Sequence, residues 1–527
     1  MTKALKCFIL WIVYLNFTLS RLVEPKALQE IEREFGEVRK TTMDLFTPLQ
    51  PEDAVIQAND FGSPPNWHIA HVTWFFHQLL NKYGRNKNIT KSKANEINLR
   101  YLNSYYQRFG EILPKSERGR YPRPNIRDTI KYRRIIEREI ISFLNYVGQA
   151  CNEENKKVLE EVLYHITLGS QHEMQHQELM IYDFQYYYQR FSDPDDNYNP
   201  IRRRTISVPA SGTATASVRE TESSSLKSPH LELEYQNNKR FSPEKGGKAN
   251  NQRILSASDI LENIFQQMAI IKGGLYELGF NGKGFCYDNE LPEHSVYLNP
   301  YKIDKFPVTN GEFARFIEDG GYDNYRYWLS DGWGLAQEKN WHAPLYWERS
   351  AKDSGWIKKD FRGANKLNPN EPVTNVSYYE ADAYAKWAKK RLPTEAEWEK
   401  AASWNGNLQR KTMYPWGDER PTSVYANLME SYLWGPSEVG SFPLGKSYYG
   451  CHQMIGDIWE WTSSEYVLYP GFESKFPEYT DKWAINQKVL RGGCFATPSK
   501  QIRNSYRNYF RPHDRILFSG FRCAKDL

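Results

Sequence analysis

Residues 155–188 read NKKVLEEVLYHITLGSQHEMQHQELMIYDFQYYY, and this stretch decides how the N-terminal part of the chain folds. Its apolar residues recur every three to four positions, which predicts one long amphipathic helix. The centre of the helix holds His172 and His176 at a spacing of four, so both imidazoles project from one face. Such a pair can bind one metal ion, although most helical histidine pairs at this spacing are incidental.

Three further segments predict helices that could pack against the first. They are ALQEIEREFGEVRKTTMDLF (27–46), NWHIAHVTWFFHQLLNKY (66–83) and NIRDTIKYRRIIEREIISFLNYV (125–147). Four long amphipathic helices joined by loops predict an antiparallel four-helix bundle, which we place at 25–190.

The helix predicted at 66–83 offers more histidines. Trp67, His71 and Trp74 follow helical spacing on one aromatic stripe, which should face the bundle interior, whereas His68 and His77 fall to its sides. An inward histidine is either a core residue with a hydrogen-bond partner or a ligand. The stripe therefore makes His71 the candidate third ligand without deciding between these interpretations.

If His71 meets His172 and His176 across the bundle, three imidazoles form a site with open coordination positions. That ligand set, without cysteine or carboxylate, suits Fe(II) or a catalytic zinc ion. His165 lies on the same stripe but about 10 Å along the helix axis from His172, too far to close a compact site. Glu178 lies about 200° around the helix from His176 and fits better as a hydrogen-bond partner behind the ligands.

The composition changes twice after the bundle. Residues 191–262 are rich in Ser, Thr, Pro and charge, with no aromatic residue between Tyr198 and Tyr235. Such a segment cannot bury enough apolar surface to order itself, so we predict a disordered linker without a catalytic role. Residues 263–527 have short apolar runs broken by turn residues, which predicts a turn-rich α+β domain. Two helical patches interrupt it, at 311–321 and 377–391.

Length and charge narrow the class of protein. A chain of 527 residues predicts two or three domains, and a net charge of only +5 gives no electrostatic case for a nucleic-acid partner. The six cysteines are scattered without a CxxC pair, which argues against a zinc ribbon or a disulfide framework.

The first 24 residues raise the question of targeting. CFILWIVYLNFTL (7–19) follows two lysines and is too short for a comfortable membrane span. It is typical of a signal peptide, or else forms an extra helix. The cysteine usage favours the reducing cytosol, so the two signals conflict and the compartment stays open.

WHIAHVTWFF (67–76) and QHEMQHQE (171–178) together resemble the DinB-like bundle of the non-haem iron sulfoxide synthases of ergothioneine biosynthesis. The C-terminal half is similar to their second domain, a C-type-lectin-like fold of the formylglycine-generating (sulfatase-modifying) type. The stretches that carry this second resemblance include YWLSDGW (327–333), APLYWE (343–348), RLPTEAEWE (391–399) and GDIWEWTSS (456–464).

The resemblance implies that His71, His172 and His176 hold Fe(II). The implied reaction uses O2 to join the sulfur of cysteine to C2 of hercynine, with oxidation to a sulfoxide. Alternatives are a sister oxygenase of selenoneine or ovothiol type, a DinB-like metal-dependent hydrolase or thiol transferase, and a lectin-like module without catalysis. The partners expected are small molecules, and the oligomeric state is open.

Family resemblance also implies a proton donor and a carboxylate-binding residue. Tyr105 and Tyr106 match a tyrosine pair that supplies the proton in one branch of the family, whereas another branch uses a tyrosine of the C-terminal domain, here somewhere in LYPGFESKFPEY (468–479). An arginine fork pairs well with a carboxylate, and Arg118 is our candidate from the loop that also holds Arg120 and Arg123.

The remaining substrate-binding candidates come from QHEMQHQE and RNYFRPHDR (507–515). Gln175 is expected to face the imidazole of the substrate, Asn508 the betaine group and Tyr509 the trimethylammonium, by cation–π attraction. Arg515 is a further candidate. Phe510 stands where the branch that uses γ-glutamylcysteine carries an aspartate, which favours free cysteine as the sulfur donor.

Other prominent residues are interpreted as architecture. The tryptophans of the C-terminal motifs, at 398, 416, 459 and 461, are expected to pack rather than react. Cys494 and Cys523 could correspond to the thiols of formylglycine-generating enzymes only if they meet in space, and the sequence gives no indication that they do.

Overall fold

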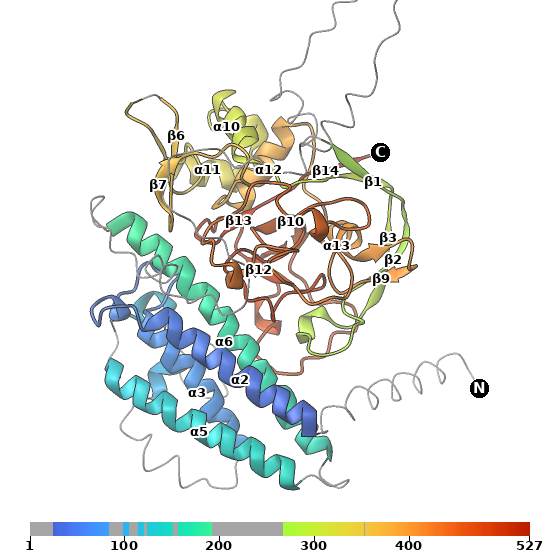
Figure 1. The fold of residues 1–527 in the computed structure, drawn as a ribbon. Helices are drawn as coiled ribbons and strands as arrows, with labels where there is room; N and C mark the ends of the chain where they lie inside the picture. Colours follow the sequence, from blue (N-terminus) through green and yellow to red (C-terminus); the bar gives the residue numbers. More distant parts are fainter. Residues whose placement is uncertain are drawn as a thin grey trace, which may run out of the picture.

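The computed structural model describes residues 25–83, 99–104, 114–120, 124–150, 156–191, 267–352 and 354–527. The helical N-terminal part and the larger C-terminal domain lie side by side, with α6 (Lys156–Phe191) running along the boundary (Figure 1). The apolar N-terminal stretch, the predicted linker from 192 onward, Tyr105, Tyr106 and Arg123 lie outside the described residues.

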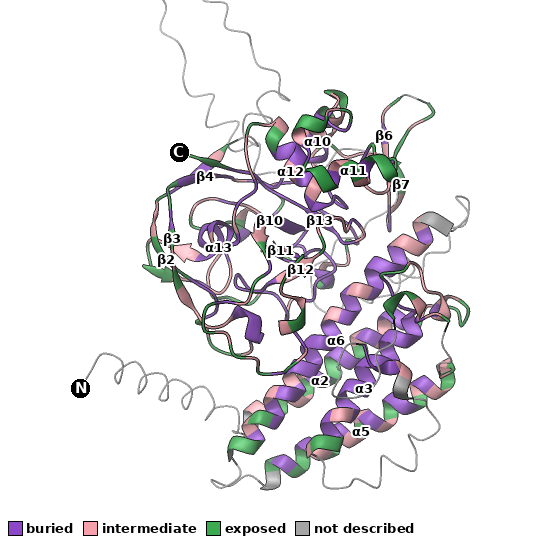
Figure 2. Ribbon diagram, turned by 180° about the vertical axis from the view of Figure 1, so that it is seen from behind, coloured by how far each residue is buried: buried purple, intermediate pink, exposed green. Residues whose placement is uncertain are grey.

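The N-terminal part is a bundle of four long helices, as predicted. They are α2 (Pro25–Phe46), α3 (Pro65–Tyr83), α5 (Ile126–Ala150) and α6. Helices α2 and α3 each pack against both α5 and α6. Helix α3 begins at Pro65, which suits a first turn because its missing N–H would have no helical partner. The helix is buried from Pro65 to His77, so its polar side chains must find partners inside the protein (Figure 2).

A buried ion cluster ties three helices of the bundle together. Glu173 of α6 accepts hydrogen bonds from Arg39 (2.9 Å), Arg133 (2.5 Å) and Thr42 (2.6 Å). Burial alone would raise the pKa of Glu173, but the guanidinium groups of Arg133 and Arg39 outweigh it and lower the pKa to about 2. The carboxylate is therefore charged at neutral pH, and it fixes the rotation of α6 about its axis relative to α2 and α5.

The C-terminal domain consists of short strands in small sheets, covered by short helices. One antiparallel sheet has the order β1 (Met268–Ile271), β4 (Tyr301–Asp304), β14 (Ala524–Asp526). A second has the order β12 (Asn508–Phe510), β11 (Lys488–Arg491), β10 (Trp459–Glu465), β13 (Ser519–Gly520). The others are β2 (Gly274–Leu278) with β3 (His294–Leu298), β5 (Trp347–Arg349) with β6 (Trp356–Asp360) and β7 (Gly363–Lys366), and β8 (Trp404–Asn405) with β9 (Arg410–Lys411).

The helices of this domain are short. They are α10 (Asn310–Glu318), α11 (Ser330–Glu338), α12 (Tyr378–Trp387) and α13 (Glu395–Ser403). All of them except α11 begin with a capping box. The helical patches predicted at 311–321 and 377–391 correspond to α10 and α12, whereas α11 and α13 were not predicted. Each of these two spans nine residues, too few for apolar periodicity to stand out.

The motif RLPTEAEWE encodes a helix start and a set of buried carboxylates. Thr394 and Glu397 form a capping box at the start of α13. Glu395 accepts a hydrogen bond from Arg507 at 2.7 Å, and Glu399 pairs with the fully buried Arg491. These carboxylates are committed to arginines of the core, which supports an architectural role for the motif.

The two parts share one continuous hydrophobic core. Phe75 of α3 packs on Phe476 of the C-terminal domain, with ring centroids 5.4 Å apart. Along α6, Tyr164 stacks on Phe285 at 5.8 Å and Tyr182 packs edge-on against Phe518 at 4.9 Å. The C-terminal domain therefore covers a full face of α6, the face next to the predicted histidine site.

Within the described part of the chain, no helix combines the length and the apolar character that crossing a membrane requires.

Candidate metal centre

The three predicted histidines converge inside the bundle. His71 comes from α3, and His172 and His176 come from successive turns of α6. One ring nitrogen of each lies within 4.8 Å of the others, and Nε2 of His172 is 3.0 Å from Nε2 of His176. All three are buried, and in the described ranges they are the one group of three or more His, Cys, Asp or Glu side chains that could hold a metal ion.

The hydrogen bonds of His71 prepare it to act as a ligand. Its Nδ1–H donates to the carbonyl oxygen of Leu102 at 2.5 Å, because a carbonyl can only accept. The lone pair is therefore on Nε2, which is buried and has no hydrogen-bond partner among the residues that the structure describes. A buried nitrogen without a partner is costly unless something else, such as a metal ion, occupies the position in front of it.

Burial also keeps the cluster neutral. It lowers the pKa of His172 to about 3, and burial followed by the proximity of the other imidazoles lowers the pKa of His71 and of His176 well below the ordinary value. Neutral imidazole is the form that binds a metal ion, so the cluster is competent at neutral pH. Three neutral nitrogen donors fit Fe(II) or a catalytic zinc ion, because both accept imidazole and leave positions for other ligands.

A fourth histidine, which we predicted to fall to the side of the stripe, lies directly behind the cluster. Nδ1 of His68 is 2.6 Å from Nδ1 of His176, and its Nε2 is 3.5 Å from a carboxylate oxygen of Asp183. His68 lies one turn before His71, and Asp183 lies two turns after His176. Their spacing was visible in the sequence, but their contact depends on how α3 and α6 are rotated against each other.

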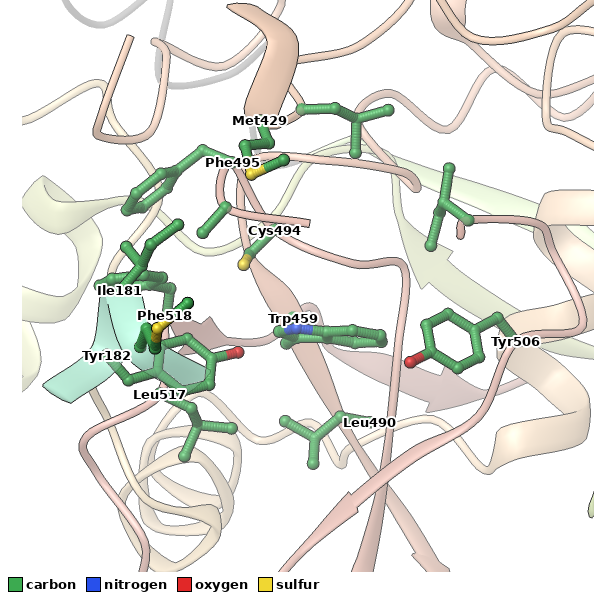
Figure 3. Packing of buried hydrophobic residues seen from close by; sticks show 14 of the residues in the cluster. Ile181, Tyr182, Met429, Trp459, Leu490, Cys494, Phe495, Tyr506, Leu517 and Phe518 are labelled. Carbon is green, nitrogen blue, oxygen red and sulfur yellow. The ribbon is translucent and has the colours of Figure 1, made fainter. Parts of the chain in front are cut away.

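The interpretation of Glu178 as a hydrogen-bond partner of the ligands needs correction. Its carboxylate accepts hydrogen bonds from Trp459 Nε1 (2.6 Å) and Thr497 Oγ1 (2.6 Å) of the C-terminal domain, and from the hydroxyl of Tyr182. Figure 3 shows the Tyr182 hydroxyl pointing toward Trp459, with Cys494 beside them. Two residues after His176, Glu178 lies on a side of α6 that faces the C-terminal domain.

The C-terminal domain approaches the cluster through two tyrosines, which hydrogen-bond to Gln175 of α6. Tyr479 lies edge-on to His172, with ring centroids 5.7 Å apart, and its hydroxyl donates to Gln175 Oε1 at 2.6 Å. Gln175 Nε2 donates in turn to the hydroxyl of Tyr506 at 3.2 Å. Both ends of the Gln175 amide are therefore bonded to the other domain, and its expected role toward the imidazole of the substrate stays a prediction. Tyr479 is the last residue of LYPGFESKFPEY, where no single tyrosine could be chosen from sequence.

Of the loop arginines, Arg118 lies near the cluster. Its guanidinium lies over the ring of Trp67 at 3.8 Å and donates to Ser63 Oγ at 2.8 Å. Trp67 stacks on His71 with ring centroids 4.5 Å apart, so Arg118 is one side chain away from a ligand. Arg120 is exposed. The structure thus brings together His71, His172, His176, Gln175 and Arg118.

Of the substrate-binding candidates in RNYFRPHDR, one contacts α6. Phe510 lies at 6.5 Å from Tyr182, edge-on, and Tyr509 stacks on Tyr466 at 3.9 Å. The side chain of Asn508 accepts from the backbone N–H of Tyr509, a local contact. None of these contacts involves a histidine of the cluster.

Arg515 is a correction. Its guanidinium donates to the carbonyl oxygen of Ala343, forms an ion pair with buried Glu380 at 3.1 Å and lies over Trp341 at 4.3 Å. These partners are distant in the sequence, so its motif gave no sign of them. We interpret Arg515 as a structural residue rather than a substrate-binding one.

Cys494 and Cys523 have different surroundings. Cys494 contacts Thr497 and lies beside Glu178, whereas Cys523 lies beside Asp304 and takes part in backbone pairing with it. Burial raises the pKa of both thiols well above the ordinary value. Both thiols therefore stay protonated at neutral pH. This counts against the paired-thiol chemistry that Cys494 and Cys523 would need to share with formylglycine-generating enzymes.

Comparison with known proteins places both parts of the chain. The model of the family "sulfatase-modifying factor enzyme 1-like domain" matches residues 258–527, just over half of the chain, and the DinB superfamily model matches residues 34–180. The chain therefore belongs to the sulfatase-modifying factor enzyme 1-like family, and the predicted fold class, a DinB-like bundle with a domain of this type, is confirmed.

Three relatives illustrate the range of the family. Hercynine oxygenase of Mycobacterium tuberculosis is 42% identical over 242 residues, which cover 46% of this chain and 56% of that protein. Hercynine oxygenase of Mycolicibacterium smegmatis is 38% identical over 266 residues, 49% of this chain and 61% of that protein. Formylglycine-generating enzyme of Thermomonospora curvata is 31% identical over 302 residues, 50% of this chain and 95% of that protein.

The chain thus spans between half and two thirds of the length of these hercynine oxygenases. The predicted resemblance to the ergothioneine sulfoxide synthases is confirmed by the match of both domains and by the relatives named hercynine oxygenase. The solved structure of PvdO from Pseudomonas aeruginosa is similar over 49% of this chain and 94% of its own, with 22% identity and a TM-score of 0.34, too weak to carry an argument.

Proposed function

We propose that this protein is a non-haem iron oxygenase that joins cysteine to hercynine. The observation that carries the proposal is the buried, neutral cluster of His71, His172 and His176, with a ring nitrogen of His71 that has no partner among the described residues. The choice of hercynine as substrate rests on the relatives named hercynine oxygenase, which match about half of this chain.

The reaction that we propose balances without a further reductant. The C2–H bond of hercynine and the S–H bond of cysteine are replaced by a C–S bond, one oxygen atom enters the sulfoxide, and the other leaves as water. The two substrates together lose four electrons, which reduce one molecule of O2. Fe(II), when bound by the three histidines, would supply the binding and activation of O2.

The residues around the cluster are suited to position the substrates and to donate a proton. Gln175 is held by Tyr479 and Tyr506, so its position next to the ligands is fixed by the closed arrangement of the two domains. The phenol of Tyr479 is a proton donor at neutral pH and lies against His172. Arg118 carries a positive charge near His71, which suits the carboxylate of a small amino acid.

Free cysteine remains our choice of sulfur donor. An aspartate at position 510 could pair with the ammonium group of γ-glutamylcysteine, and the phenyl ring of Phe510 cannot. A site that lacks such a partner loses the discrimination that a buried polar contact supplies. The proposal therefore predicts a higher kcat/KM with cysteine than with γ-glutamylcysteine.

The test combines metal analysis with O2 consumption. The full-length protein should bind iron and consume O2 when hercynine and cysteine are both present, and mass spectrometry should find their sulfoxide conjugate. His71→Ala, His172→Ala and His176→Ala should each abolish iron binding, because two imidazoles cannot hold Fe(II) firmly. His77→Ala, a buried histidine of α3 outside the cluster, is the matched control and should keep its iron.

Two results would contradict the proposal. Full iron occupancy in one of the three cluster variants would remove that residue from the ligand set. A tenfold or greater preference for γ-glutamylcysteine would overturn the choice of sulfur donor.

A further inference from the structure

A chain of polar side chains leads away from the histidine cluster toward the far side of the bundle. His176 is followed by His68 at 2.6 Å, between the two Nδ1 atoms, and His68 by Asp183 at 3.5 Å, between Nε2 and Oδ2. His68 and Asp183 are 3% and 5% exposed, so water neither screens these contacts nor competes for them. Neither residue belongs to the proposed set of ligands.

The order of donors and acceptors along this chain follows from His176. Its Nε2 is 3.0 Å from Nε2 of His172. When both atoms bind the same metal ion, each must present a lone pair, which places the ring proton of His176 on Nδ1. That proton can only be donated to Nδ1 of His68, which must then accept. The proton of His68 is therefore on Nε2, the atom that faces the carboxylate of Asp183. At 3.5 Å this contact is long for a hydrogen bond but still places a negative charge beside the N–H.

Asp183 is itself held in place for this role. Asn59 Nδ2 donates to Oδ1 at 3.1 Å, and the backbone N–H of Ser63 donates to Oδ2 at 3.2 Å. The loop leaves room for the carboxylate because residue 62 is glycine. A Cβ atom on Gly62 would lie 2.1 Å from Asp183 Oδ1, so any other residue would push the carboxylate away.

We propose that His68 and Asp183 are positioning residues that fix the tautomer and the ring orientation of His176, and so aim its Nε2 at the metal ion. The inference rests on the proposed function, because it takes the histidine cluster to be a metal site. His71 has its proton fixed by a backbone carbonyl, that of Leu102. His176 instead has an imidazole backed by a carboxylate, which makes the ligand more electron-rich than a neutral carbonyl would.

The experiment measures the affinity of the metal-free, full-length protein for Co(II) under anaerobic conditions, from the visible absorption of the bound ion. His68→Leu removes the acceptor for His176 and should weaken Co(II) binding 10- to 100-fold. His68→Asn places an amide oxygen at about the position of Nδ1 and should restore most of the loss. Asp183→Asn should weaken binding less than His68→Leu. His77→Leu, on the same helix and also buried, is the control and should bind like wild type.

The outcomes separate this inference from the proposed function. If wild type binds no Co(II), the metal site itself is wrong. If wild type binds and His68→Leu binds within threefold of it, only the positioning role is overturned. Equal losses in His68→Leu and His68→Asn would also overturn it, because the acceptor would then be irrelevant. If His68→Leu does not fold, Asp183→Asn decides, since wild-type affinity and an unchanged Co(II) spectrum in this variant would contradict the positioning role.

Discussion

At the scale of single residues, the question is which phenol can deliver a proton at the histidine cluster. Tyr105 and Tyr106, the pair favoured by family resemblance, lie outside the described residues, so their role stays a prediction. Tyr479 lies against His172 and donates to Gln175. Tyr469 belongs to the core instead, because its ring lies 4.0 Å from the guanidinium of Arg507.

Replacing the phenol should divert the reaction rather than stop it. We expect Tyr479→Phe to keep iron and O2 consumption but to shift products from the sulfoxide to cysteine sulfinate, in which both oxygen atoms end on sulfur. General acids typically contribute 10²- to 10⁴-fold, so the product ratio should change plainly. Product analysis by mass spectrometry is the measurement, with the double variant Tyr105→Phe, Tyr106→Phe as the comparison. A shift in the double variant and none in Tyr479→Phe would assign the role to the tyrosine pair.

The residues that could be predicted are those whose signal is local. Helical spacing and an aromatic stripe made His71, His172 and His176 candidates, the family resemblance implied that they are ligands, and the structure brings them together. His68 was assigned to the side of the stripe. A helical wheel shows the direction in which a side chain projects, but not which residue of a neighbouring helix it contacts. The misplacement of Arg515 has the same cause, since its partners come from segments far away in the sequence.

At the scale of elements, α6 packs against the bundle with one face and against the C-terminal domain with another. One face holds Glu173, which is buried among the arginines of the bundle, and another holds Glu178, which is buried against the C-terminal domain. The long bundle helices were predictable because their apolar periodicity extends over many turns. The short strands and α13 were not, because contacts distant in the sequence decide where they begin and end.

Glu178 should therefore matter for stability more than for metal binding. Glu178→Ala leaves the buried donors of Trp459, Thr497 and Tyr182 without their acceptor, at a cost of about 1–3 kcal/mol for each group left unsatisfied. Urea unfolding should show a large loss of stability, while Co(II) affinity should stay within about threefold of wild type, a smaller change than the loss we expect in His68→Leu. Glu178→Gln keeps the shape and some of the bonding, so its loss should be smaller. A variant of normal stability that binds Co(II) as poorly as His68→Leu would return Glu178 to the metal site.

The contact between α3 and α5 predicts a pH dependence. His77 of α3 bonds to the hydroxyl of Tyr132 at 2.8 Å, and burial lowers its pKa to about 4. The unfolded chain takes up this proton near pH 6.5 and the folded protein only near pH 4. The free energy of unfolding should therefore fall as the pH falls between these values, by up to about 1.4 kcal/mol per pH unit. In His77→Gln this part of the slope should be missing. Parallel slopes for the two proteins between pH 7 and pH 5 would show that His77 is not the group responsible.

At the scale of the whole molecule, the histidine cluster lies where the two domains pack against each other. Phe75 and Gln175 of the bundle contact Phe476, Tyr479 and Tyr506 of the C-terminal domain around the cluster. Sequence motifs could predict each domain but not this contact, because it pairs residues that are 304 or more positions apart in the chain. A core shared by both domains makes the chain one unit of folding rather than two.

Proteolytic cleavage between the two domains tests whether they fold as one unit. A protease site inserted within 210–217, in the segment predicted to be a linker, should allow cleavage into two halves that remain associated. The interface buries aromatic rings such as Phe75 and Tyr182, so separation would expose a large apolar surface on each half. After cleavage we expect both fragments to elute together, to unfold in one transition and to bind Co(II) like the intact protein. Cleaved Glu178→Ala, which lacks the central polar contacts of the interface, should dissociate more readily. Separate elution of a folded bundle that still binds Co(II) would show that the metal centre needs only the N-terminal domain.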